Sequence, residues 1–305
     1  MPVLGDRGAV MMTRPPSTVK AAMWMAGWLS AMLVLAVAGR ETTRELAVFQ
    51  IMEMRSVIGL ILLWPLVLRS GGLALIRTQR LGQHILRNTV HYASQFGWFV
   101  ALTMIPLAQL VAIEFTMPIW TAVLAVAVLG ERMGLWKTTA VALGLFGVAI
   151  IVRPHAGAIA PGQLIALAAA VGFAISVITV KVMTRTESTV AIVFWMLLVQ
   201  SVLGLLPAVH AWHWPSAQVW PWVIVISVCG TFSHFCMARA MLYADATVVV
   251  PMDFLRVPFT ALIGWWLYAE GIDAYTLFGA GLILSGNLLN LKGAGAARAP
   301  AVRAT

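Results

Sequence analysis

The sequence contains little charge and almost no cysteine. Lys, Arg, Asp and Glu make up only 10% of its 305 residues, whereas 61% are hydrophobic and the mean hydropathy is +0.91. One water-soluble core does not need so much apolar surface, so the composition excludes a soluble enzyme. The two cysteines, Cys229 and Cys236, lie too far apart along one helix to bond to each other.

The sequence also lacks the motifs that bind nucleotides or support hydrolysis. It has no G-x-x-x-x-G-K-[ST] phosphate loop, no G-x-G-x-x-G, no H-E-x-x-H and no G-x-S-x-G. No pair of His and Cys residues has the close spacing of a metal site. We therefore expect no enzymatic activity, no cofactor and no bound metal. Any movement of a solute must draw on a gradient or on exchange.

Apolar segments follow one another along the whole chain, and each is about as long as a helix that crosses a bilayer. They cover residues 21–38, 47–68, 89–106, 108–129, 135–152, 163–182, 189–209, 219–241, 246–268 and 274–291. We therefore predict an all-α integral membrane protein with ten transmembrane helices. The tails 1–20 and 293–305 are predicted to be disordered. A cleavable secretory signal is the alternative for the first segment.

The distribution of basic residues predicts how the helices are oriented. Most basic residues lie in the two tails and in every second loop. The loops between these contain only Arg40, Arg44 and Arg153. By the positive-inside rule, both termini are cytoplasmic and the chain lies in the lipid bilayer of the cell (inner) membrane. The net charge of +9 is not gathered into a patch for nucleic acid. Fourteen basic residues lie in the tails and in alternate loops: Arg7, Arg14, Lys20, Arg69, Arg77, Arg80, Arg87, Arg132, Lys137, Lys181, Arg185, Lys292, Arg298 and Arg303.

The chain matches itself at an offset of 139 residues. This offset predicts two repeats of five helices, 21–152 and 163–291. Because five is odd, the second repeat enters the membrane from the opposite side, as in many secondary transporters. Nine positions are identical without a gap: Ser94 and Ser233, Phe96 and Phe235, Ala101 and Ala240, Val111 and Val250, Phe115 and Phe254, Thr121 and Thr260, Ala122 and Ala261, Glu131 and Glu270, and Gly147 and Gly286.

The same offset aligns Glu114 with Asp253, and both lie deep in apolar segments. A charged side chain at the bilayer centre costs roughly 2.5–3.5 kcal/mol, so an acid there indicates a function. Arg256 follows Asp253 by three residues on the same helical face and is its expected partner, with a purely structural ion pair as the alternative. Glu114 has no basic neighbour on its own helix. Its partner must be another span, a substrate cation or a proton, and we expect a substrate or a proton.

Other polar residues inside apolar segments are weaker candidates for a substrate or coupling site. Glu53 and Arg55 face different sides of the second segment, so each is expected to meet another span. His91 and Gln95 share a face of the third segment, and Gln95 aligns with His234 of the eighth. Histidine can carry a coupling proton near neutral pH, or it can donate a structural hydrogen bond between helices.

Prolines predict that the two helices with aligned acids are bent or broken. Pro118 leaves the Glu114 carbonyl without its donor, and Pro258 does the same to Phe254, with Pro251 nearby. Carbonyls freed at membrane depth are tolerated where protein, water or ligand satisfies them, as in transporter sites. A simple packing kink is the alternative.

Small residues in the fifth and tenth segments predict a close approach of helices, either as packing within the chain or as a homodimer through these helices. They are Ala140, Gly144, Gly147, Gly279, Gly281 and Gly286.

In these features the chain resembles the drug/metabolite transporter superfamily with two EamA repeats. The resemblance covers residues 21–291 and implies an inverted five-plus-five bundle whose central cavity opens to one side at a time. Residues 250–256, Val-Pro-Met-Asp-Phe-Leu-Arg, look like the branch that includes S-adenosylmethionine carriers. The resemblance rests on Arg55, on the stretch from Pro118 through Glu131 and Arg132, on its counterpart Tyr268-Ala269-Glu270, and on the Gly-rich fifth and tenth segments.

We therefore predict a secondary transporter of a small zwitterionic or cationic metabolite, amino-acid-like or S-adenosylmethionine-like. An ammonium or sulfonium would face Glu114 and Asp253 while a carboxylate faces Arg256. Two alternatives belong to other classes. One is a non-transporting scaffold or sensor with structural charges. The other is a membrane enzyme, although the longest internal loop, 69–88, is merely basic. The direction of transport and the coupling ion stay open.

Overall fold

The computed structural model describes residues 17–69, 71–129, 134–152, 160–183, 187–241, 243, 253, 255–271 and 273–296. Each of the ten predicted segments contains helix within these residues. The elements are α1 (Thr18–Thr42), α2 (Val48–Arg69), the short 3-10 helix η1 (Gly72–Ala74), α3 (Leu81–Met104), α4 (Leu107–Glu114), α5 (Met117–Leu129), α6 (Leu135–Val152), α7 (Pro161–Met183), α8 (Thr189–His210), α9 (Trp220–Met241), α11 (Arg256–Tyr268) and α12 (Ala274–Ala296).

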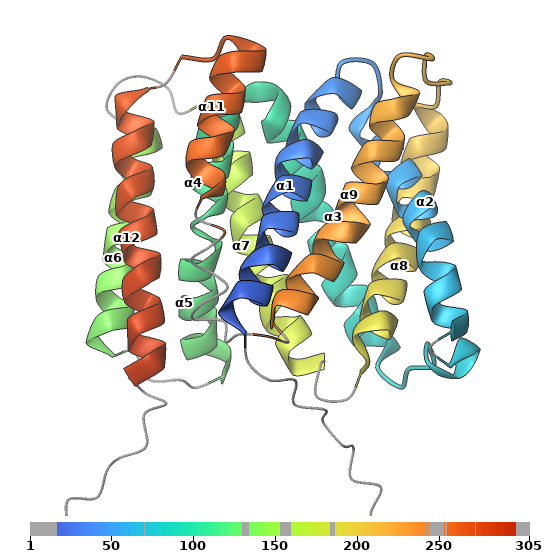
Figure 1. Ribbon diagram of the computed structural model, residues 1–305, viewed down its shortest axis with the longest axis horizontal. Helices are drawn as coiled ribbons and strands as arrows, with labels where there is room; N and C mark the ends of the chain where they lie inside the picture. Colours follow the sequence, from blue (N-terminus) through green and yellow to red (C-terminus); the bar gives the residue numbers. More distant parts are fainter. Residues whose placement is uncertain are drawn as a thin grey trace, which may run out of the picture.

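The helices stand side by side in one bundle (Figure 1). We call the end at which α1 begins and α12 ends the lower end. α1 ends beside the end of α3, because Arg40 donates to the carbonyls of Leu102 at 2.8 Å and Ile105 at 2.9 Å. We call this opposite end the upper end. α7 begins there, since a Cβ on Gly162 would lie 2.8 Å from Met104 Cβ. The first helices of the two predicted repeats therefore run in opposite directions.

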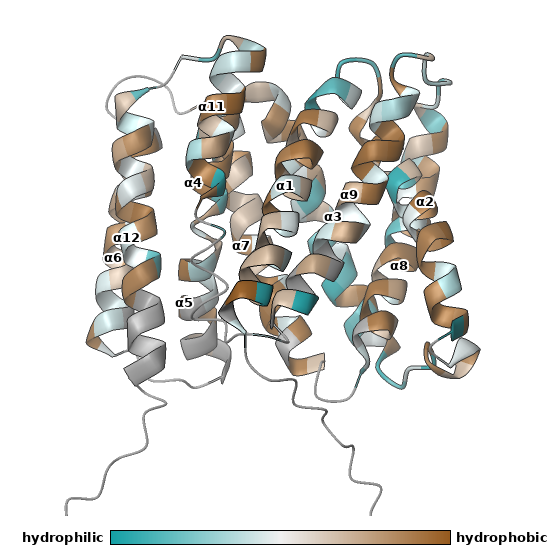
Figure 2. Ribbon diagram, in the orientation of Figure 1, coloured by the Kyte–Doolittle hydropathy of each residue, from teal (hydrophilic) through white to brown (hydrophobic). Residues whose placement is uncertain are grey.

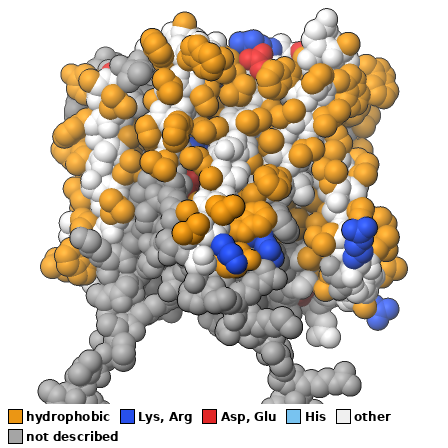
Figure 3. Space-filling view, in the orientation of Figure 1, with side chains coloured by type: hydrophobic (Ala, Val, Ile, Leu, Met, Phe, Trp, Pro, Cys, Tyr) orange, Lys and Arg blue, Asp and Glu red, His pale blue; other side chains and the backbone are white. Residues whose placement is uncertain are grey.

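The outer surface of the bundle is apolar. Leu206 and Trp266 are 81% and 76% exposed. Hydrophobic residues run along the helices, and hydrophilic residues gather at the connections (Figure 2). Hydrophobic side chains cover the face in Figure 3, where Lys and Arg lie mainly near the two ends. An apolar surface of this extent is unfavourable in water, whereas it is favourable in contact with lipid. Within the residues that the structure describes, four helices are long and apolar enough to cross a membrane: Val19–Thr42, Val48–Arg69, Pro161–Val180 and Val190–His210.

α4 is the interior helix of the bundle. Leu107, Leu110 and Ile113 are fully buried in the main hydrophobic core. The helix packs on α11, α7 and α12. Its last residue, Glu114, is therefore carried into the interior by an apolar element that has helices on several sides.

The fourth predicted span is broken into two helices, as its proline predicted. α4 ends at Glu114 and α5 begins at Met117. Thr116 closes the break by donating its hydroxyl to the carbonyl of Ile113 at 2.7 Å. Pro118 lies in the first turn of α5, where a missing N–H removes no helical hydrogen bond. Pro258 likewise lies in the first turn of α11, and Pro251 lies outside the described residues.

Helix α3 is longer than predicted. It begins at Leu81 rather than at residue 89, so Arg87 lies inside the helix and not in a loop. Arg87 is buried and donates to the Asn88 side-chain oxygen at 2.6 Å. Hydropathy alone missed these first turns because their polar side chains are buried against neighbouring helices. The predicted tails are also shorter at their inner edges, since α1 begins at Thr18 and α12 extends to Ala296.

The small residues of the fifth and tenth spans bring α6 and α12 into contact. A Cβ on Gly147 would lie 2.6 Å from the Gly279 carbonyl oxygen, and the reverse distance is also 2.6 Å. A Cβ on Gly286 would lie 2.8 Å from the Ala140 carbonyl. Packing within one chain therefore accounts for these glycines, and the homodimer stays a prediction.

We expect Gly279→Val to destabilise the protein, because the new side chain must push the backbone of α6 away. Overpacking of this kind costs roughly 1–3 kcal/mol. Gly281→Val is the matched control, since a Cβ on Gly281 meets nothing within 4 Å. Thermal unfolding of the purified protein in detergent measures both. Equal melting temperatures for the two variants would contradict the packing described here.

Candidate functional site

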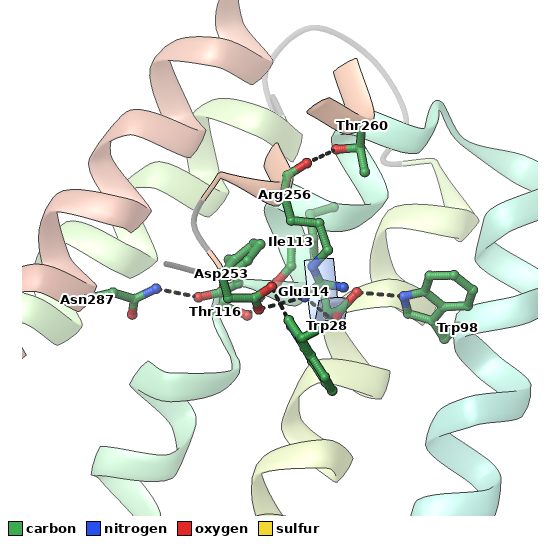
Figure 4. Close-up of polar contacts among 10 residues, drawn as sticks. Trp28, Trp98, Ile113, Glu114, Thr116, Asp253, Arg256, Thr260 and Asn287 are labelled. Carbon is green, nitrogen blue, oxygen red and sulfur yellow. Dashed lines mark hydrogen bonds and ion pairs between the residues drawn. The ribbon is translucent and has the colours of Figure 1, made fainter. Parts of the chain in front are cut away.

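Three charged residues meet where two short helices adjoin. Arg256 Nη2 lies 2.9 Å from Glu114 Oε1 and 3.3 Å from Asp253 Oδ2. Arg256 is the first residue of α11 and Glu114 is the last residue of α4, and these two helices pack together (Figure 4). We call Glu114, Asp253 and Arg256 the charged cluster. The structure thus brings together the two acids that the repeat aligned and the arginine expected to pair with one of them.

Glu114 has a partner on another span. The sequence favours a substrate cation or a proton as this partner, whereas the structure places Arg256 of α11 there. The predicted pair of Arg256 with Asp253 is also present. One guanidinium therefore serves two carboxylates. When all three groups are ionised, the charged cluster carries one excess negative charge, which favours an added cation.

Two tryptophans complete the hydrogen bonding of the acids. The indole N–H of Trp98 in α3 donates to Glu114 Oε2 at 2.8 Å, and that of Trp28 in α1 donates to Asp253 Oδ1 at 2.8 Å. Each carboxylate oxygen thus accepts a hydrogen bond, as buried charges require.

An aromatic ring and an amide support the arginine and the helix break. The Arg256 guanidinium carbon lies 4.9 Å from the centroid of the Phe115 ring, within cation–π range. The Phe115 carbonyl, at the break after α4, accepts a hydrogen bond from Asn287 of α12 at 2.8 Å. The protein thereby satisfies a carbonyl that the break leaves outside the helical pattern.

The acids are more accessible than the arginine. The side chains of Glu114 and Asp253 keep 16% and 13% of their surface, whereas Arg256 keeps 6%. The guanidinium is therefore the most deeply buried group of the charged cluster.

The two repeats share their acids but not their arginine. Position 117, which the offset aligns with Arg256, is Met. The backbone around both positions is alike, because Thr121 donates to the Met117 carbonyl at 2.9 Å and Thr260 donates to the Arg256 carbonyl at 2.8 Å. A single cation therefore lies between two symmetry-related acids.

The second-span candidates point away from each other, as predicted. Glu53 lies against Gly204 of α8 and the Tyr92 hydroxyl of α3. Arg55 lies near Gly230 of α9, with its Nη1 3.7 Å from where a Cβ would stand. Neither residue takes part in the contacts of the charged cluster described above.

The third-span candidates are buried on α3. His91 packs against the Phe173 ring of α7 at 5.4 Å between centroids. The Gln95 side-chain oxygen is buried and has no hydrogen-bond partner among the residues that the structure describes. His234 lies on α9, and its side chain falls outside the described residues. A role for these three residues stays a prediction.

Sequence reasoning missed Trp28, Trp98, Phe115 and Asn287. Two signals were available. An indole N–H inside the membrane needs an acceptor, and Asn287 is an amide in an otherwise apolar segment. Neither signal specifies which distant residue is the partner.

A second ion pair joins the helix ends at the upper end of the bundle. Arg40, at the end of α1, pairs with Glu270, just after α11. Glu270 also accepts from the backbone N–H of Leu107, the first residue of α4, at 2.9 Å. Ala269 takes a left-handed conformation with φ 52°. This residue turns the chain at the end of α11, so that Glu270 folds back against that helix. We call Arg40 and Glu270 the upper ion pair.

Each of α4 and α11 therefore carries charged contacts at both ends. α4 begins at the upper ion pair and ends in the charged cluster, whereas α11 begins in the charged cluster and ends next to the upper ion pair. A shift of either helix would disturb both sets of contacts.

Comparison with known proteins identifies relatives of this chain. The model of the EamA-like transporter family matches residues 20–153 and 160–292. An S-adenosylmethionine uptake transporter of Rickettsia prowazekii is 27% identical over 79% of this chain and 81% of that protein. A riboflavin transporter of Brucella anthropi is 29% identical over 77% and 85%. A pseudopaline exporter of Pseudomonas aeruginosa is 26% identical over 80% and 86%.

One solved crystal structure has the same fold. It superimposes with a TM-score of 0.65 at 18% identity, over 92% of this chain and 100% of that one.

We expect Arg256→Gln to lower the free energy of unfolding by about 3–5 kcal/mol, because it leaves two largely buried carboxylates without their cation. Adding Glu114→Gln and Asp253→Asn to this variant removes the uncompensated charge and should restore most of the stability. Thermal unfolding in detergent compares the single and triple variants. An Arg256→Gln protein as stable as wild type would show that the charges are solvated rather than paired.

Proposed function

Because the chain belongs to the EamA-like transporter family, we propose that it carries a small zwitterionic or cationic organic metabolite across the membrane through the charged cluster. The family places the chain in the drug/metabolite transporter superfamily as a secondary transporter and not as an enzyme. The substrate class is our proposal. The single observation that carries it is one arginine shared by two acids at equivalent positions of the two repeats.

A zwitterion matches the charged cluster group by group. Its ammonium or sulfonium can take the place of Arg256 beside Glu114 or Asp253, and its carboxylate can then bind the released guanidinium. Binding thus replaces internal ion pairs by equivalent pairs with substrate, so no charge is left unpaired in the membrane interior.

The relatives transport chemically different compounds. S-adenosylmethionine carries a sulfonium, an ammonium and a carboxylate, whereas riboflavin carries no cation. The paired acids favour the first kind of substrate for this chain. Relatives include both uptake proteins and an exporter, so they do not decide the direction.

The upper ion pair supports alternating access. It holds the ends of α1 and α11 against the start of α4, which closes these elements together at the upper end. We propose that this contact breaks when the charged cluster opens to that side. The basic loops predict that the lower end is cytoplasmic and the upper end is external.

Ligand binding to the purified protein tests the substrate class. We expect S-adenosylmethionine or another zwitterion, from a panel with amino acids, polyamines, nucleosides and riboflavin, to raise the melting temperature of wild type. Glu114→Gln and Asp253→Asn should remain folded and lose the shift. Glu41→Gln, at the end of α1, is the control and should keep it. A shift by riboflavin alone, or one that survives in both acid variants, would refute the proposed site.

Labelling of an engineered cysteine tests the upper ion pair. In a variant without Cys229 and Cys236, Thr116→Cys places a thiol beside Glu114, where position 116 is only 1% exposed. We expect Glu270→Gln to increase its modification by an impermeant reagent from the upper side severalfold, because the pair no longer holds α11.

Arg44→Gln is the control for the labelling experiment, since Arg44 is 61% exposed and pairs with Glu41 at the surface. If this control and Glu270→Gln change labelling equally, the upper ion pair has no gating role.

A further inference from the structure

A second polar site lies between α2, α3 and α8, apart from the charged cluster. Glu53 and Tyr92 are 5% and 8% exposed. Their polar atoms converge on Gly204, because a Cβ there would lie 2.7 Å from Glu53 Oε2 and 2.9 Å from the Tyr92 hydroxyl. The missing side chain at position 204 therefore leaves room for a carboxylate and a phenol in the interior.

The polar atoms of this site lack partners among the described residues. Glu53 Oε2, the Tyr92 hydroxyl and both amide atoms of Gln200 are buried without a hydrogen bond. Gln200 is fully buried and lies one turn before Gly204, so it shares that face of α8. Unpaired polar groups in a membrane interior cost several kcal/mol each. Several unpaired polar atoms at one place indicate a site that exchanges a proton, an ion or a ligand with solvent.

The polar side chains continue toward the lower end. Asn88 is fully buried one turn before Tyr92 on α3, and its amide nitrogen has no partner within the described part of the chain. One further turn down the helix, His84 faces Glu187 at 4.0 Å. Helices α3 and α8 pack against each other. The row leads from Glu53 to the end of the bundle that the basic loops predict to be cytoplasmic.

No positive charge in the described residues neutralises Glu53. From α3 it faces the phenol of Tyr92, and from α8 it faces Gly204, which does not titrate. Arg55 on the same helix points instead toward Gly230 of α9. An ionised carboxylate in such surroundings is costly, so it must take up a cation.

We propose that Glu53 is the proton-binding site of this transporter, with Tyr92 and Gln200 as the buried polar residues of the same site. The proton forms an O–H bond at Oε2 and cancels the negative charge, which requires a single acceptor. A metal cation would need several more oxygen ligands than the carboxylate and phenol that converge here. The row through Asn88 and His84 provides the route for the proton.

Helix α3 connects this site to the charged cluster. It carries Tyr92 at the Glu53 site and Trp98, whose indole holds Glu114. A change in the charge of Glu53 that moves α3 therefore changes the hydrogen bonding of the substrate site. This coupling rests on the proposed function, whereas proton binding at Glu53 does not.

Infrared difference spectroscopy of the full-length protein in detergent tests proton binding without a substrate. Raising the pH should remove a carboxylic acid C=O band from wild type. Glu53→Gln should lack this band, and Glu41→Gln, near the upper surface, should keep it. Circular dichroism verifies that Glu53→Gln is folded. A pH-difference spectrum unchanged by Glu53→Gln overturns the proposal.

Proteoliposomes test the coupling with S-adenosylmethionine as the probe. An imposed pH gradient should raise its accumulation at least fivefold in wild type. Glu53→Gln should lose this increase and retain one-for-one exchange. Accumulation driven by a sodium gradient and not by pH overturns proton coupling. If the probe is not moved at all, the substrate class has failed, and the infrared result still decides whether Glu53 binds a proton.

Discussion

The need to balance charge inside an apolar bundle governs this structure. Two carboxylates and one guanidinium meet among helices whose outer surface faces lipid, and each carboxylate oxygen accepts a hydrogen bond. The arginine holds two elements far apart in the sequence, the end of α4 and the start of α11. Because an unpaired charge is costly away from water, the substrate that we propose for this cluster would have to replace the contacts that it breaks.

The two short helices turn this local balance into a property of the whole bundle. α4 has only eight residues, and its ends touch the upper ion pair and the charged cluster. α11 begins at the charged cluster and ends next to the upper ion pair. The break near Phe115 separates α4 from α5. In the proposed transport cycle, a shift of α4 or α11 would disturb the contacts at both places.

Glu53 follows a different rule from the acids of the charged cluster. Each oxygen of those acids accepts a hydrogen bond, whereas Glu53 Oε2 has no partner among the described residues. This difference is why we propose exchange with a charged substrate for the first two acids and exchange with a proton for Glu53. Helix α3 reaches both places, so one element can report the state of each to the other.

The sequence by itself determined the family of this protein and its helical spans, and it drew attention to the two acids of the charged cluster. Hydropathy and the offset of 139 residues can both be read directly from the sequence. The apolar segments, the break before Pro118 and the alignment of Glu114 with Asp253 were therefore predictable. Hydropathy does not predict that polar groups are buried. For this reason it placed the start of α3 later than Leu81, where the helix begins.

Tertiary structure alone decided the partners: Arg256 for Glu114, Trp28 and Trp98 for the two acids, and Glu270 for Arg40. These pairs join residues on different helices, and their distances depend on how the helices pack rather than on any spacing along the chain.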